Sequence, residues 1–170
     1  MASETLPVKY LRAGEEYLAA LKTLGLHPEL LGWGTDVSTK QWQLIMMTSI
    51  VEVGGPLALN RLLFSAYNMG ATPKEISPFI IHVIGDRSLY ASELRQLLQF
   101  HQGDKKLRRV DKYTNQAVGE PIQAISMSKT IGGFKIESHN LYTVHLRKQG
   151  YEQKTREWMR FKRNVEKLAA

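Results

Sequence analysis

The stretch QWQLIMMTSIVEVGGPLALNRLLFSAYN, residues 41–68, joins an apolar run, a glycine pair and a helical pattern in direct succession. The run 41–53 is apolar on both alternating faces, and its β-branched residues favour a strand covered on both sides over a buried helix. In residues 57–68, apolar residues recur at i, i+3, i+4 and i+7, which predicts an amphipathic helix. This order predicts a layered α/β unit in which the helix crosses over to a second strand.

The glycine pair inside this stretch raises the question of a phosphate site. A dinucleotide site requires G-x-G-x-x-G, and a P-loop requires glycines that end in Gly-Lys-Ser/Thr. Gly54-Gly55-Pro56 provides neither the third glycine nor the lysine. Gly55 suits an N-cap and Pro56 suits the first helical position, where its missing N–H costs nothing. We therefore interpret the pair as the corner between the strand and the helix.

The flanking segments extend the same pattern. Residues 5–24 predict an amphipathic helix capped by Gly25, and residues 27–36 predict at most one helical turn before a polar loop. A second run that is apolar on both faces predicts a strand over residues 78–85. The leucine spacing that follows predicts a helix over residues 86–103, which we expect to end at Gly103.

The last 70 residues differ in character. Gly132-Gly133, between two alternating runs, predicts a two-residue hairpin. Residues 141–148 predict a half-exposed strand, and the charged segment 103–116 predicts a loop or an exposed strand. Residues 151–168 predict a charged helix. The predicted fold is α+β: a mixed sheet of about five strands packed with helices, an amphipathic N-terminal helix and a basic C-terminal helix.

The length of 170 residues fits one domain, with any subdomain boundary near residue 103 between a layered part (1–103) and a basic part (104–170). The chain has no cysteine, which excludes disulfides and thiolate metal sites. The longest near-apolar run, LIMMTSIVEV, is too short to cross a membrane, and the N-terminus lacks the apolar core of a secretory signal. We expect a soluble, cytoplasmic protein without membrane contact.

The positive charge is concentrated in the C-terminal part. Residues 1–100 hold 8 basic and 9 acidic residues, net −1, whereas residues 101–170 hold 15 and 7, net +8. Such asymmetry indicates contact with an anionic partner, and the alternative interpretation is surface charge that only maintains solubility. In the predicted last helix, four basic residues at i, i+4, i+7 and i+11 form one ridge, and two lysines flank it. The predicted binding residues are Lys105, Lys106, Arg108, Arg109, Lys112, Lys154, Arg156, Trp158, Arg160, Lys162, Arg163 and Lys167.

These residues predict a non-enzymatic binding module or accessory subunit that contacts nucleic acid or an acidic protein. Trp158 or Tyr151 would add stacking to a nucleic acid if exposed. The apolar stripe of the same helix, which we expect to pack down, includes Tyr151, Trp158 and Phe161. Because the stripe is narrow, an alternative is a homo-oligomer assembled through residues 151–168.

A second alternative is an enzyme whose site lies where the second predicted strand ends. His82, Asp86 and Arg87 are the candidate catalytic residues, because open α/β sheets place ligands at the carboxyl edge of their strands. The simpler interpretation is that Asp86 or Ser88 caps the next helix. The histidine spacing matches no zinc hydrolase, and there is no G-x-S-x-G elbow. We expect no metal and no cofactor.

Overall fold

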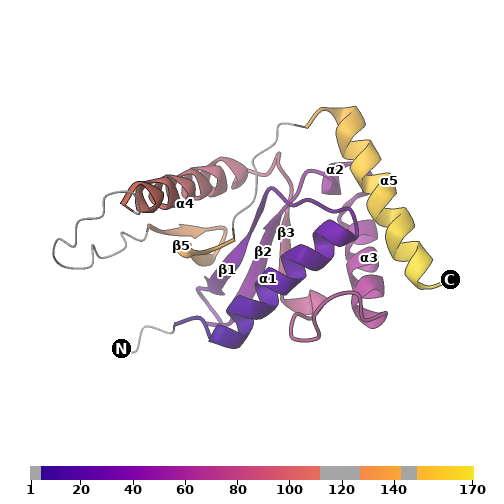
Figure 1. Cartoon of the computed structure of the whole chain (residues 1–170), viewed down its shortest axis with the longest axis horizontal. Helices are drawn as coiled ribbons and strands as arrows, with labels where there is room; N and C mark the ends of the chain where they lie inside the picture. Colours follow the sequence, from indigo (N-terminus) through magenta and orange to yellow (C-terminus); the bar gives the residue numbers. More distant parts are fainter. Residues whose placement is uncertain (1–4, 112–126, 143–148) are drawn as a thin grey trace.

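The computed structural model describes residues 5–111, 127–142 and 149–170, and of residues 103–111 only the backbone. This part of the chain contains five α-helices, a 3-10 turn and a mixed five-stranded sheet (Figure 1), which confirms the predicted α+β class. In chain order the elements are α1 (Val8–Thr23), β1 (Leu30–Asp36), β2 (Trp42–Met47), α2 (Val51–Gly54), α3 (Pro56–Asn68), η1 (Pro78–Ile80), β3 (Ile81–Ile84), α4 (Ala91–Asp111), β4 (Ser128–Ile131), β5 (Phe134–Leu141) and α5 (Tyr151–Leu168).

The strand order in the sheet is β3-β2-β1-β5-β4. Only β2 and β3 run parallel, with Leu44 opposite Ile81, and the other neighbours are antiparallel. Parallel neighbours need a crossover connection, and α2 and α3 provide it here. The predicted crossover around residues 57–68 is therefore confirmed.

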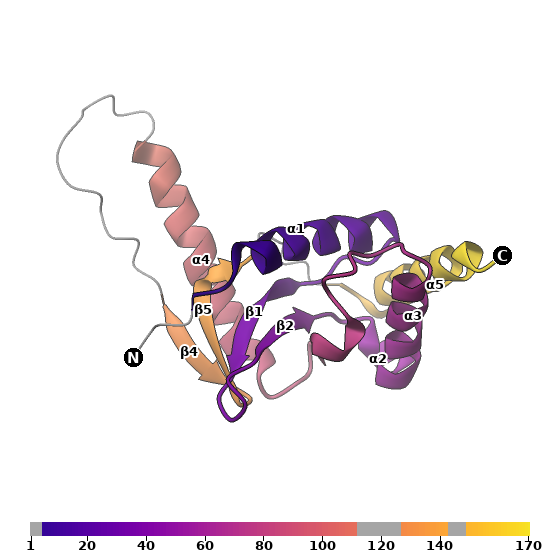
Figure 2. The same ribbon diagram turned by 90° about the horizontal axis from the view of Figure 1, so that it is seen from below.

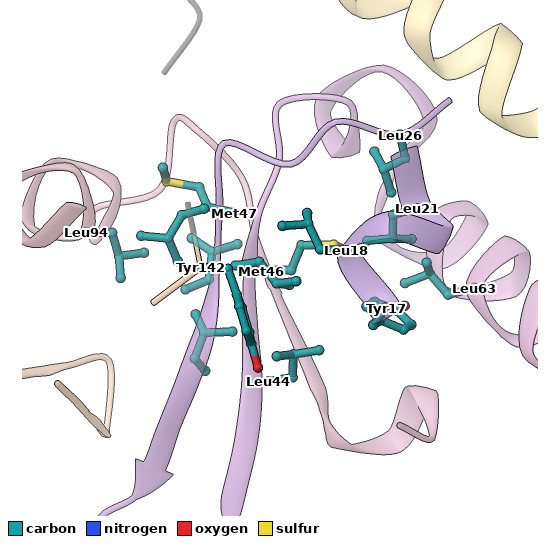
Figure 3. Close-up of a cluster of buried hydrophobic side chains, with 14 of the residues drawn as sticks. Tyr17, Leu18, Leu21, Leu26, Leu44, Met46, Met47, Leu63, Leu94 and Tyr142 are labelled. Atoms are coloured by element: carbon teal, nitrogen blue, oxygen red, sulfur yellow. The ribbon is translucent and has the colours of Figure 1, made fainter. Parts of the chain in front are cut away.

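Helices cover both faces of the sheet. Successive residues of a strand point to opposite faces, so Met46 and Met47 enter different parts of the core, and both are fully buried. Figure 3 shows Leu94 of α4 on one side of the strands, and Leu18 of α1 and Leu63 of α3 on the other. In Figure 2, α1 crosses its face of the sheet along most of its length.

The central strand β1 was missed by the sequence analysis, which assigned residues 27–36 to a turn and a loop. Two glycines hide the strand pattern, because glycine is depleted in strands. Here they make room for the neighbouring strand β5. A Cβ on Gly32 would lie 2.4 Å from the Leu141 side chain, and one on Gly34 would lie 3.0 Å from Ile136.

The strand predicted over residues 41–53 exists but ends at Met47. Residues 51–54 form the short helix α2 instead, despite β-branched residues that favour a strand. The strand ends before Thr48, whose N–H donates to the Ile84 carbonyl. Ile50, the residue before α2, is fully buried. Tertiary packing has overridden the local preference.

The prediction that a helix ends at Gly103 was wrong. Helix α4 begins at Ala91 and continues through Gly103 to Asp111, so the prediction of a loop or strand from residue 103 was also wrong as far as Asp111. A glycine inside a helix costs only about 1 kcal/mol relative to alanine, and the lysines, arginines and leucine that follow are good helix formers. Lys112 and the rest of that segment lie outside the described residues.

The hairpin predicted at Gly132-Gly133 is confirmed. Both glycines have positive φ, at 58° and 87°, as this kind of two-residue turn requires, and β4 pairs antiparallel with β5 on either side. Of the strand predicted over residues 141–148, Leu141 is the last residue of β5, and residues 143–148 lie outside the described part of the chain.

Helix α5 forms an outer layer. It packs on α2 and α3 rather than on the sheet. Figures 1 and 2 both show α5 at one end of the molecule and α4 running away from it toward the other end. Nowhere among residues 5–111, 127–142 and 149–170 is a helix long and apolar enough to cross a membrane.

Candidate functional site

Helix α5 has one buried side and one exposed, basic side. Its buried side contains Trp158, Phe161 and Val165, which are at most 9% exposed. The opposite side is exposed and contains four of the predicted cations, which we call the basic ridge: Arg156, Arg160, Arg163 and Lys167. The spacing of i, i+4, i+7 and i+11 places them along one side of the helix.

Few carboxylates neutralise this ridge. Arg156 lies 3.8 Å from Glu152 within α5, and both side chains are exposed. Arg160, Arg163 and Lys167 form no ion pair with any other residue that the structure describes. Lys162 is also exposed, but it lies on the other flank of the helix and pairs with Glu166 at 3.9 Å. The ridge therefore presents nearly unpaired positive charge to the solvent.

Two residues of the predicted surface are corrected by their burial. Trp158 is 9% exposed, and its ring lies against Gly54, where an added Cβ would be 2.2 Å from the ring. It is therefore not available to stack on a base. Lys154 is 8% exposed and points into the protein instead of flanking the ridge. For Tyr151 the expectation was the reverse. We expected its side chain to be buried, and it is 75% exposed.

Lys154 lies at the centre of a buried ionic cluster. Its Nζ donates to Asp86 Oδ2 at 2.8 Å and to Glu52 Oε2 at 3.3 Å. Glu52 also accepts from the backbone N–H of Arg87, whose side chain reaches the same carboxylate at 3.2 Å. Asp86 follows the end of β3, and Glu52 lies in α2 beyond the end of β2. Through Lys154, the first turn of α5 is thus bound at the carboxyl edge of the two parallel strands.

A second ion pair extends the cluster toward α4. Arg95 Nη2 lies 3.3 Å from Glu29 Oε2 and also donates to the main-chain carbonyl of Asp86. Glu29 precedes β1, whose antiparallel pairing with β2 brings its first residues to the same edge. Burial raises the pKa of Glu29 above its usual value, although the hydrogen bond and the charge of Arg95 act against burial.

The pKa shifts of Asp86 and Lys154 argue for an anchor rather than a proton-transfer site. Burial alone would raise the pKa of Asp86, but interactions with Glu52 and Lys154 and the charge of Arg95 outweigh burial and lower it. The hydrogen bond to Asp86 raises the pKa of Lys154 despite the cost of burial. A general acid or base works best with a pKa near neutral pH, and both shifts lead away from it.

The structure does not bring the three candidate catalytic residues together. Asp86 and Arg87 both contact the cluster, but Arg87 is largely exposed and bonds to Glu52. His82 lies in the edge strand β3, and its ring packs on Phe134 with centroids 4.7 Å apart. Ser88 serves the turn before α4, where its hydroxyl accepts from the Tyr90 N–H at 3.3 Å.

Further contacts fix the orientation of α5. Glu157 is buried and accepts from the His27 N–H at 2.7 Å and from the Gln149 amide at 2.8 Å. Asn164 donates to the Leu24 carbonyl at 3.0 Å. The helix is therefore tied to the loop between α1 and β1 as well as to the ionic cluster, and its basic ridge has a defined orientation.

The glycine pair that precedes α3 has a structural explanation. Gly54 admits the Trp158 ring, as described above, and Gly55 has φ +81° and ψ 157°, a conformation that L side chains rarely adopt. Pro56 then begins α3 as predicted. These contacts agree with a corner, but the corner joins helix α2 to helix α3 and not a strand to a helix, as we expected.

The other predicted basic segment belongs to a different region. Lys105, Lys106, Arg108 and Arg109 lie in the C-terminal half of α4, and their side chains, like the whole of Lys112, are outside the described part. Because α4 runs away from α5 (Figure 1), these residues and the ridge do not form the continuous surface that we expected.

The ionic cluster was missed by the sequence analysis, although one signal for it exists. Lys154 precedes Trp158, Phe161 and Val165 by four, seven and eleven residues, so it lies in the buried stripe itself. A charge in that position predicts a buried partner, because lysine is almost never fully buried unless it is paired. The identity of the partners, Asp86 and Glu52, depends on tertiary structure.

The described residues include no group of three or more histidine, aspartate or glutamate side chains that could hold a metal ion. No protein-family model, curated protein or solved structure matches this chain. The functional argument therefore rests on the geometry of α5 and its surroundings.

Proposed function

We propose that this chain is a non-enzymatic binding module or accessory subunit that holds an anionic partner on the basic ridge of α5. The observation that carries the proposal is the division of α5 into two sides. One side is fixed by buried apolar and ionic contacts, and the other exposes four cations in a row. The cytoplasmic location expected from the sequence is part of this proposal.

The fixed backbone of α5 matters for binding. Partner binding costs free energy when it must order mobile groups, and a helix that is already anchored avoids most of that cost. The exposed ion pairs of α5 compete only weakly with an anionic partner for the cations, because each such pair contributes at most about 1 kcal/mol to stability. An anionic partner is therefore the ligand that this surface favours.

The alternative of a homo-oligomer through α5 receives less support. Apart from the exposed Tyr151, the apolar stripe that would form such an interface is buried within the same chain, in a helix that packs on α2 and α3. On the exposed side of α5, Met159 is the large apolar residue between the cations, and two such sides would repel each other.

Retention on a heparin column, with elution by a salt gradient, tests the proposal. The ridge variant carries Arg156→Glu, Arg160→Glu and Arg163→Glu. The matched control carries Arg12→Glu, Lys40→Glu and Lys74→Glu, which are exposed residues outside α5. Each substitution changes the charge by two units, so both variants go from a formal net charge of +7 to +1.

We expect the ridge variant to elute at a much lower salt concentration than the control. Equal elution of the two variants would show that net charge, and not the ridge, determines binding, and would contradict the proposal. Circular dichroism of both variants verifies that the fold is retained.

A further inference from the structure

We infer, on the basis of the proposed function, that the partner is the phosphate backbone of a double-stranded nucleic acid, bound without base recognition, and that Lys22 of α1 belongs to the same surface. This inference adds three statements to the proposed function: the class of anion, the mode of contact and a second element in the footprint.

The position of Lys22 follows from how α5 meets the end of α1. Lys22 is exposed in the last turn of α1, and its carbonyl accepts from the Gly25 N–H at 3.0 Å. Gly25 is in close contact with Arg160, since a Cβ added there would lie 2.9 Å from the arginine Cδ. The end of α1 thus borders the ridge beside Arg160 and adds one cation to it.

A single strand is disfavoured because no aromatic side chain in the described part of the chain forms a platform beside the ridge. Proteins that bind single strands stack bases on aromatic side chains beside a basic groove. Trp158 is buried, and Tyr151 lies five residues before Arg156, which places it about 140° around the helix from that arginine. The other strongly exposed aromatic side chain of the described residues, Phe79, is in η1, where it packs on Phe64.

Recognition of adenine is disfavoured because the amide side chains of this region form hydrogen bonds within the protein. Asparagine and glutamine read adenine through bidentate hydrogen bonds in the major groove. Asn164 donates to the Leu24 carbonyl, and Gln153 accepts from the Gly150 N–H at the start of α5. Gln149 bonds to both Ser49 and Glu157. Where arginine and lysine contact phosphates instead of base edges, they position the backbone and carry no sequence information.

An acidic protein is disfavoured by the low apolar content of the surface. Protein interfaces have a core enriched in aromatic residues and methionine and depleted of charge, whereas nucleic-acid interfaces are much more positively charged. Met159, 56% exposed, is the large apolar side chain among the ridge cations. The ridge runs from Arg156 to Lys167, 12 residues whose ends are about 16 Å apart along the helix, which matches about five phosphates along one strand of a duplex.

Fluorescence anisotropy over a salt series tests the inference. The probes are a labelled 20-base-pair duplex, a second duplex of scrambled sequence, one single strand of the first duplex, and a labelled polyglutamate peptide. The proteins are the unmodified chain, Lys22→Ala and, as the matched control, Lys74→Ala, another exposed lysine outside the surface.

Five phosphate contacts predict a slope of log K against log salt of about −4.5 for the duplex, which is a loss of about 500-fold between 50 and 200 mM salt. We expect the two duplexes to bind equally and the single strand more weakly. Lys22→Ala should make the slope shallower by about 0.9, and Lys74→Ala should leave it unchanged.

Each part of the inference has its own contrary result. Tighter binding of the single strand would overturn the duplex assignment, and a strong preference for one duplex would overturn backbone-only contact. An unchanged slope in Lys22→Ala would remove α1 from the footprint. Binding of polyglutamate but not of the duplex would overturn the inference and leave the proposed function intact. If both the ridge variant and its control are retained on heparin like the unmodified chain, the proposed function itself is rejected.

Discussion

The Lys154 ammonium lies 2.8 Å from the Asp86 carboxylate, and this contact joins the first turn of α5 to the end of β3 across 68 positions of sequence. The lysine side chain is 10% exposed and the aspartate side chain 16%. Both charged groups are thus largely removed from solvent, and their attraction to each other offsets the cost of this desolvation. The contact explains why a helix with so many cations turns one of them inward.

Loss of the lysine should destabilise the fold. In Lys154→Met, the largely buried carboxylate of Asp86 loses its cation, while Glu52 keeps its ion pair with Arg87, and breaking a buried pair in this way costs about 3 kcal/mol. Urea denaturation of the variant measures this cost. Lys162→Met is the control, since its exposed pair with Glu166 is worth less than about 0.5 kcal/mol. Equal stabilities of the two variants would contradict the anchoring role of Lys154.

The stability should fall in acid through Asp86. Its pKa is lowered in the folded protein, so the stabilisation is fully present above the unfolded value of about 4 and is lost as the pH falls through the lower folded pKa. In Asp86→Asn, the free energy of unfolding should be reduced at pH 6, and the difference from the unmodified chain should shrink below pH 4. Urea midpoints between pH 6 and pH 2 measure both curves. A constant difference over that range would show that the Asp86 charge contributes nothing.

A mid-helix glycine provides a third prediction. Gly14 lies in α1 in close contact with the Tyr142 side chain, so that a Cβ added to the glycine would clash with the tyrosine hydroxyl oxygen. That hydroxyl donates to the Leu11 carbonyl at 2.7 Å and accepts from Trp33 Nε1 at 2.8 Å. Alanine is the better helix former by about 1 kcal/mol, yet Gly14→Ala should lower the thermal midpoint because it displaces this buried network. A raised midpoint would show that propensity outweighs the close contact.

Local signals predicted much of the fold. The strand over 42–47, the helix over 56–68 and the Gly132-Gly133 hairpin follow from patterns that short-range geometry determines. Two errors concern glycines and have different causes. Gly32 looks like a break in a strand but admits the Leu141 side chain within the sheet. Gly103 looks like a helix end, but the good helix formers after it continue α4 to Asp111.

The basic ridge could also be predicted, because helical spacing alone brings its four cations to one side of α5. The ionic cluster could not be predicted in the same way. Its members come from the ends of β2 and β3 and from α5, and only the pairing of the parallel strands brings Glu52 and Asp86 together. Sequence position therefore identified Asp86 as notable but gave it the wrong partners.

Chemical-shift mapping by NMR tests the central claim most directly. A 20-base-pair duplex is titrated into the ¹⁵N-labelled protein at low salt, and backbone amide and arginine Nε signals are followed. We expect the largest changes at Arg156, Arg160, Arg163 and Lys167, smaller changes around Lys22, and none at Lys154 or Trp158. Changes centred on His82, Asp86 and Arg87, or no changes on α5, would contradict that claim.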